Sequence, residues 1–201
     1  AVPYTYLGMT QVANHAATDA LSSFASAIEL IEEDAGPFAV ELIRPLKGVA
    51  MARIALADYD GAEDTLRRAQ NIIHRSGGVY SADQLSILEW LIRIHGDQRQ
   101  MVEADREELL YLKVHEEVFG PADLRTVPAL QRVAEYMAGR GMDFQYGRRP
   151  PRIRRNDYFK FALELYDRAI EIVELEYGVE SDQLIEPLRA IARVRFAYGF
   201  G

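Results

Sequence analysis

The sequence predicts an all-α fold, a solenoid of about eight helices within a single helical-repeat domain spanning residues 1–201. Three observations predict it. The sequence is internally repetitive, its apolar residues recur every three or four positions, and Gly and Pro fall between the apolar runs. Apolar and polar residues do not alternate as they would in strands.

The repeat is visible in the glycines and in the columns around them. Gly36, Gly78 and Gly120 are evenly spaced and define a 42-residue period. Three further columns of residues keep this period over the first three repeats. The last repeat follows after a longer interval, which is one period plus an insertion of 16 residues. The columns are Ala20, Ala62, Ala104 and Ala162; Leu30, Ile72, Val114 and Ile172; and Leu46, Leu88, Leu130 and Leu188. Each unit is therefore expected to hold the same supersecondary structure.

The apolar runs set the expected helices, which are 12–34, 38–57, 60–76, 82–96, 100–118, 123–139, 157–177 and 182–198. Ser81, Asp123 and Ser181 occupy one equivalent position before such a run and are residue types that cap helix N-termini. Short loops make neighbouring helices antiparallel, and each hairpin buries its apolar face against the next.

The N-terminus leaves two alternatives. A single helix is expected over 12–34, but six residues keep the repeat spacing and could form a degenerate first unit: Tyr4, Leu7, Gly8, Ala20, Phe24 and Ala27. That unit would need a turn near Asn14–Thr18, where the sequence has no Gly or Pro.

The spacing of Leu46, Val49, Ala50, Tyr59, Ala62, Leu66 and Ala69 resembles the tetratricopeptide repeat. The segment from Ala162 to Ile172, followed by Gly178, looks like the longer 42-residue subtype of kinesin light chains and their bacterial relatives. The resemblance implies a right-handed α-α superhelix. The subtype's usual His before the first helix of a unit and its groove Asn are both missing, since Met51, Arg93, Glu135 and Arg193 stand at the Asn position.

The same resemblance implies a non-catalytic scaffold that binds a protein or peptide in a concave groove lined by the first helix of each unit. The positions that match the groove are Arg44, Lys47, Met51, Ile54, Glu89, Arg93, Gln131, Glu135, Arg189, Arg193 and Phe196. The alternative is that Glu89–Arg93 and Glu186–Arg189 are ordinary pairs that solvate helix faces. The final helix has no second helix after it in the sequence, so its exposed face could also meet another chain, as in a homo-oligomer.

The insertion, at about 140–156, is rich in Arg and Pro. Its candidate contact residues are Phe144, Tyr146, Arg148, Arg149, Arg152, Arg154 and Arg155. Arg pairs with carboxylate or phosphate, so the loop could contact an acidic protein, an acidic patch of its own array or a nucleic acid. The alternatives are a solvated loop that neutralises an acidic body, or a cap over a small-ligand or enzymatic site.

Composition excludes several classes of function. The net charge is −8, and −13 without the five clustered arginines, which argues against broad nucleic-acid binding. The chain has no Cys, no apolar run long enough to span a membrane, and no metal-site His spacing or phosphate loop. We therefore expect a soluble protein without cofactor or metal, and no enzyme. Ala1 is not an initiator methionine, so a cytoplasmic location and, after a cleaved signal peptide, a periplasmic or secreted one both stay open.

Overall fold

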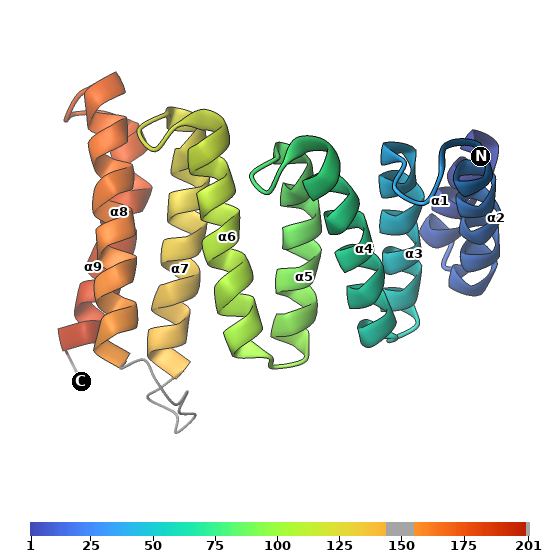
Figure 1. Cartoon of the computed structure of the whole chain (residues 1–201). Helices are drawn as coiled ribbons and strands as arrows, with labels where there is room; N and C mark the ends of the chain where they lie inside the picture. The colour runs from blue at the N-terminus through green and yellow to red at the C-terminus, as the bar shows by residue number, and fades with distance from the viewer. Residues whose placement is uncertain (144–154, 200–201) are drawn as a thin grey trace. The chain divides into compact units, whose positions relative to one another are not determined.

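The computed structural model describes residues 1–143 and 155–199, and every regular element in these ranges is helical. The α-helices are α1 (Val2–Ala13), α2 (Ala17–Ala35), α3 (Ile43–Ala55), α4 (Tyr59–Gly77), α5 (Leu85–Asp97), α6 (Met101–Phe119), α7 (Val127–Asp143), α8 (Arg155–Tyr177) and α9 (Ile185–Gly199) (Figure 1). The predicted all-α repeat fold is confirmed.

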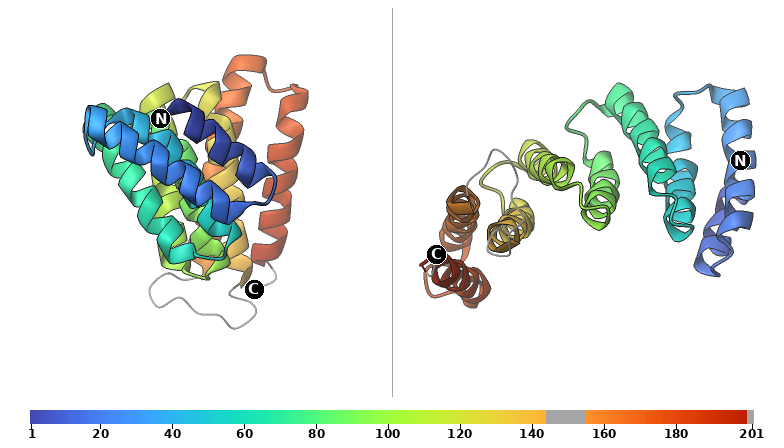
Figure 2. Two further views of the ribbon diagram at one scale, coloured as in Figure 1. Left: turned by 90° about the vertical axis from the view of Figure 1, so that its right-hand side faces the viewer. Right: turned by 90° about the horizontal axis from the view of Figure 1, so that it is seen from below.

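The chain divides into two compact units, Ala1–Glu107 and Glu108–Gly201. The first holds α1 to α5 and the start of α6, and the second holds the rest of α6 and α7 to α9. Within each unit consecutive helices form antiparallel pairs, which Figure 2 shows from two further directions, and short connections join them except between α7 and α8, where residues 144–154 lie outside the described residues.

The connections between repeats follow the predicted period. Gly36, Gly78, Gly120 and Gly178 all have φ between 82° and 104°, a region that favours glycine. A single 3-10 turn then leads into the next helix. Where the sequence offers a capping side chain, it accepts a hydrogen bond from the amide two residues later, as Ser81 does from Asp83 at 3.3 Å. The predicted caps Asp123 and Ser181 do the same.

The prediction of one helix over 12–34 is wrong at its start. The chain forms α1 and α2, with a turn in which His15 has φ of 59°. Ala57 and Arg99, which lie at the equivalent positions of the next two 42-residue repeats, have φ of 58° and 60°. In the first turn the amide of Ala16 donates to the carbonyl of Gln11 at 2.8 Å, which is the closure usually made with glycine in the left-handed position. The alternative of a degenerate first repeat is therefore correct, and its turn lies where that alternative required it, although the turn contains no Gly.

The helices that flank the insertion are longer than predicted. α7 continues to Asp143 and α8 begins at Arg155, so both ends of the predicted loop over 140–156 are helical. Packing explains the extension of α7. The Arg140 side chain is buried and donates to the hydroxyl of Tyr158 at 3.2 Å, and a Cβ at Gly141 would lie 2.9 Å from the ring of Phe159.

The core of the first compact unit consists of two neighbouring clusters, and Ile28 packs against both. Phe24 is fully buried, and its ring packs so closely over Gly8 and Gly48 that neither position has room for a Cβ. Leu46 and Leu66 lie in the neighbouring cluster between α3 and α4. Small residues in the predicted columns thus allow close helix contact.

Candidate functional site

The predicted groove residues of α3 lie on one side of that helix. Arg44 is exposed, and Lys47, Met51 and Ile54 are half-buried. The guanidinium of Arg44 lies 4.5 Å from the ring centroid of Tyr6 on α1, and its Nη1 donates to the Tyr6 hydroxyl at 3.3 Å. These contacts join α1 and α3 at this surface.

A second contact extends the surface to α5. Lys47 Nζ donates to the hydroxyl of Ser86 at 2.8 Å. Farther along α5, Glu89 and Arg93 are exposed, and the guanidinium of Arg93 lies 5.5 Å from the ring centroid of Trp90. Trp90 itself packs against the core cluster, as the sequence predicted. We call the six predicted residues on α3 and α5 the first groove face: Arg44, Lys47, Met51, Ile54, Glu89 and Arg93.

In the second unit the predicted residues lie on α7 and α9. Glu135 and Arg193 are exposed and act in opposite senses on the buried Tyr166 of α8. Burial raises the pKa of the Tyr166 phenol, the Glu135 carboxylate raises it further, and the Arg193 guanidinium lowers it. Gln131 is half-buried on α7. Phe196 is 69% exposed, which is unusual for a large aromatic side chain in a helix.

One predicted groove residue is also engaged in a local pair. Arg189 Nη1 lies 2.9 Å from Glu186 Oε1, and both side chains are exposed. This is the surface pairing that the sequence offered as the alternative to a binding role. Such an exposed pair contributes little to stability, so Arg189 remains available to a ligand.

The predicted loop contacts lie almost entirely outside the described residues. This applies to Phe144, Tyr146, Arg148, Arg149, Arg152 and Arg154. Arg155 is the first residue of α8, so its backbone belongs to a helix and not to a loop.

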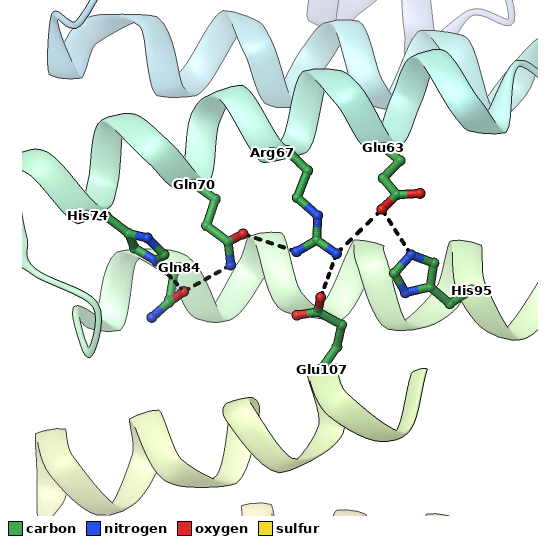
Figure 3. Close-up of polar contacts among 7 residues, drawn as sticks. All are labelled: Glu63, Arg67, Gln70, His74, Gln84, His95 and Glu107. Atoms are coloured by element: carbon green, nitrogen blue, oxygen red, sulfur yellow. Dashed lines mark hydrogen bonds and ion pairs between the residues drawn. The ribbon is translucent and has the colours of Figure 1, made fainter. Parts of the chain in front are cut away.

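The first unit also contains a polar network that the sequence analysis missed (Figure 3). At its centre is Arg67 of α4, whose Nη2 lies 2.6 Å from Glu107 Oε1 on α6 and 3.4 Å from Glu63 Oε1. Arg67 Nη1 donates to Gln70 Oε1 at 3.1 Å. The side chain of Glu107 is only 8% exposed, so this ion pair is largely shielded from water.

The network continues in both directions from Arg67. Toward one end, Gln70 Nε2 donates to Gln84 Oε1 at 3.1 Å, and the same oxygen lies 3.1 Å from His74 Nε2. Toward the other end, Nε2 of the fully buried His95 lies 3.2 Å from Glu63 Oε1. The network therefore connects α4 to the start of α5, to the end of α5 and to Glu107 of α6 (Figure 3).

Single ion pairs also join helices in each compact unit. Arg68 of α4 pairs with Glu32 of α2, and Arg168 of α8 pairs with Glu116 of α6 at 2.6 Å. Both arginines occupy one column of the repeat, and both glutamates occupy another. The repeat alone could have revealed this recurrence, because the interval between the two arginines is the one that separates Ala62 from Ala162.

A carboxylate also replaces a core residue in the second unit. Glu108 is 3% exposed, in the column that holds Phe24, Leu66 and Tyr166 elsewhere. Both of its oxygens lie 3.4 Å from the guanidinium of Arg132 on α7, which covers the ring of Tyr111.

The described residues were searched for groups of metal ligands and for helices that could span a membrane. In 1–143 and 155–199, no group of three His, Asp or Glu side chains is placed to bind a metal ion. Across the same ranges, no helix has both the length and the apolar character of a membrane span.

Comparison with known proteins shows the fold. No family model matches the sequence, and no curated protein matches it either. Among solved structures, the TPR-like repeats of the kinesin-light-chain type from Podosopora anserina align with 98% of this chain and 86% of their own, with a TM-score of 0.68 and 13% identity. BtubC (BKLC) from P. vanneervenii aligns with 98% of this chain and 72% of its own, with a TM-score of 0.65 and 14% identity. The chain thus has the tetratricopeptide-like repeat fold of the kinesin-light-chain kind.

Proposed function

We propose that this chain is a non-catalytic scaffold that binds a protein or an extended peptide on the faces of its odd-numbered helices. One observation carries the proposal. The Arg44–Tyr6 and Lys47–Ser86 contacts join α1, α3 and α5 into a continuous surface whose cations are exposed or half-buried instead of being enclosed in the core.

The chemistry of the first groove face favours an acidic, partly apolar ligand. The first groove face has three cations, Arg44, Lys47 and Arg93, and one carboxylate, that of Glu89. Met51 and Ile54 supply apolar area between them. Carboxylates of a peptide would form charge-assisted hydrogen bonds with the arginines, and burial of apolar side chains on Met51 and Ile54 would add affinity.

Affinity capture with matched variants tests the proposal. The tagged wild-type chain is compared with Arg44→Ala/Arg93→Ala and with Arg99→Ala/Arg106→Ala, which removes two exposed arginines outside the first groove face. Proteins recovered by the wild type at low salt should be lost with the first variant and retained with the second. Equal recovery by all three chains would contradict the proposal.

The Arg-rich segment 144–155 is a second candidate contact, on the basis of its sequence alone. Deleting residues 144–154 should reduce capture of an acidic partner most strongly at low ionic strength, because interactions of exposed charges are screened by salt. If the deletion instead removes bound nucleic acid, the nucleic-acid interpretation replaces this one.

The terminal helix supports the proposal that the chain self-associates. Leu188 of α9 is 51% exposed, whereas Leu46, Leu88 and Leu130 in the same column are at most 2% exposed. Sedimentation of the wild type should reveal a concentration-dependent dimer that Leu188→Glu abolishes. A wild type that stays monomeric throughout would contradict self-association.

A further inference from the structure

The first unit has a hollow on a surface that the proposed function does not use. Its volume is about 550 Å³. Leu21, Ala25 and Ile28 of α2 form one wall, and Leu46 and Val49 of α3 form the floor. Most of the accessible lining is apolar, and its size falls within the range of ligand-binding pockets.

The hollow lies on the other side of α3 from the first groove face. With 3.6 residues per turn, Leu46, Val49 and Arg53 are centred roughly 160° around the helix from Arg44, Lys47 and Met51. Binding to the hollow and binding to the first groove face are therefore separate events, and they can be tested separately.

The charged residues at the rim leave an excess of negative charge. Arg53 is already paired with a carboxylate, because its Nε lies 3.7 Å from Asp58 Oδ2, and its Nη1 also donates to Thr65 Oγ1 at 2.9 Å. Arg68 is engaged in its ion pair with Glu32. Glu29 and Asp64 are exposed, and neither forms an ion pair or hydrogen bond within the part of the chain that the structure describes.

We propose that this hollow is a second docking site, which accepts an apolar side chain of a partner protein flanked by Arg or Lys. The apolar side chain would cover Ala25, Ile28 and Val49 and displace water from them. The flanking cation would pair with Glu29 or Asp64, whereas an acidic segment would be repelled by both. The first groove face favours the opposite charge, so the scaffold could hold two partners of different chemistry at once.

Two capped peptides of opposite charge are the probes, acetyl-Arg-Leu-Phe-Arg-amide and acetyl-Glu-Leu-Phe-Glu-amide. They are titrated into the full chain while the methyl resonances of Leu21, Ala25, Ile28, Leu46 and Val49 are followed by NMR. The Arg peptide should shift these methyls and bind about tenfold more tightly than the Glu peptide, because the apolar contribution is the same for both.

Three variants separate the hollow from the rest of the surface. Glu29→Gln/Asp64→Asn should bring the affinity of the Arg peptide down to that of the Glu peptide. Glu33→Gln/Asp34→Asn, which removes the same charge from exposed positions at the end of α2, should leave the preference intact. Ala25→Leu should fill the hollow and weaken both peptides, and its exposed position keeps the fold unaffected.

The outcomes that would overturn the proposal are distinct. The docking site is wrong if the Arg peptide leaves these methyls unmoved, or if the two peptides bind equally. It is also wrong if the methyls shift on dilution of the protein alone, since a second copy would then occupy the hollow. None of these results bears on the Arg44→Ala/Arg93→Ala experiment.

Discussion

At the scale of single residues, the glycines of this chain differ in what surrounds them. Gly48 lies under the ring of Phe24, so a Cβ there would overlap the aromatic carbons, whereas nothing lies within 4 Å of a Cβ at Gly96. We expect Gly48→Ala to lower the free energy of unfolding by about 1–3 kcal/mol through overpacking. Gly96→Ala should raise it by about 0.5–1 kcal/mol, because alanine favours helix. Denaturant unfolding of both variants measures this, and equal effects would contradict the packing around Phe24.

In the turns between helices, replacing alanine by glycine should stabilise the fold where the residue has a left-handed backbone. Ala57 has φ of 58° and is exposed, so its side chain is strained without making core contacts. Ala57→Gly should raise the free energy of unfolding by up to about 1 kcal/mol. Ala25→Gly, at an exposed position inside α2, should lower it by a similar amount. If both variants are destabilised, the turn conformation is wrong.

The stability that the Asp123 carboxylate contributes should depend on pH. The Arg125 side chain, followed by the Arg125 amide, lowers the pKa of the Asp123 carboxyl to about 2. Because the pKa in the folded state is depressed, the stability that Asp123 supplies is present above its unfolded pKa of about 4 and is lost as pH falls toward 2. An NMR titration of the carboxyl carbon should give a midpoint near 2, and Asp123→Ser should lose less stability than the wild type between pH 4 and pH 2. A midpoint near 4 would contradict the contact.

At the scale of helices, the sequence predicted correctly those helices whose apolar repeat pattern lies within a single helix. The repeat columns located every helix from α3 to α9 correctly, apart from a few residues at their ends. The first expected helix, 12–34, ran across the division between α1 and α2, and only the alternative with a turn near Asn14–Thr18 was right, because the left-handed backbone of His15 is one that the sequence usually signals with Gly.

The polar network escaped prediction for a different reason. Arg67, Gln70 and Glu107 belong to residue types that are mostly exposed, so the sequence suggests a solvated helix face. Only the rotation of α4 against α5 and α6 shows that Gln70 and Glu107 are buried. The groove residues could be proposed from the sequence only because a known repeat pattern assigns those positions.

The network should hold α4 and α6 together. Glu107→Gln keeps the size of the side chain but removes its charge from Arg67, so we expect the free energy of unfolding to fall by about 2 kcal/mol. Glu103→Gln removes a half-buried carboxylate from the same helix and should change stability by less than about 0.5 kcal/mol. Similar small effects for both variants would show that the Arg67–Glu107 pair contributes no net stability.

At the scale of the whole molecule, the central claim is that a repeat scaffold presents its odd-numbered helices to a partner. Close packing of small residues builds each unit, and interhelical ion pairs set the spacing of its helices. These ion pairs lie between helices and do not involve the residues of the first groove face. A surface whose side chains already make contacts would bind a partner with less ordering of those side chains, which lowers the entropic cost of association.

Selection of peptides from a random library displayed on phage, with the immobilised chain as target, tests this claim most directly because it requires no known partner. We predict that the enriched peptides combine Asp or Glu with apolar residues. They should bind Arg99→Ala/Arg106→Ala as they bind the wild type, and bind Arg44→Ala/Arg93→Ala at least tenfold more weakly. Acidic peptides that bind all three chains equally, or a selection that enriches no peptide, would contradict the claim.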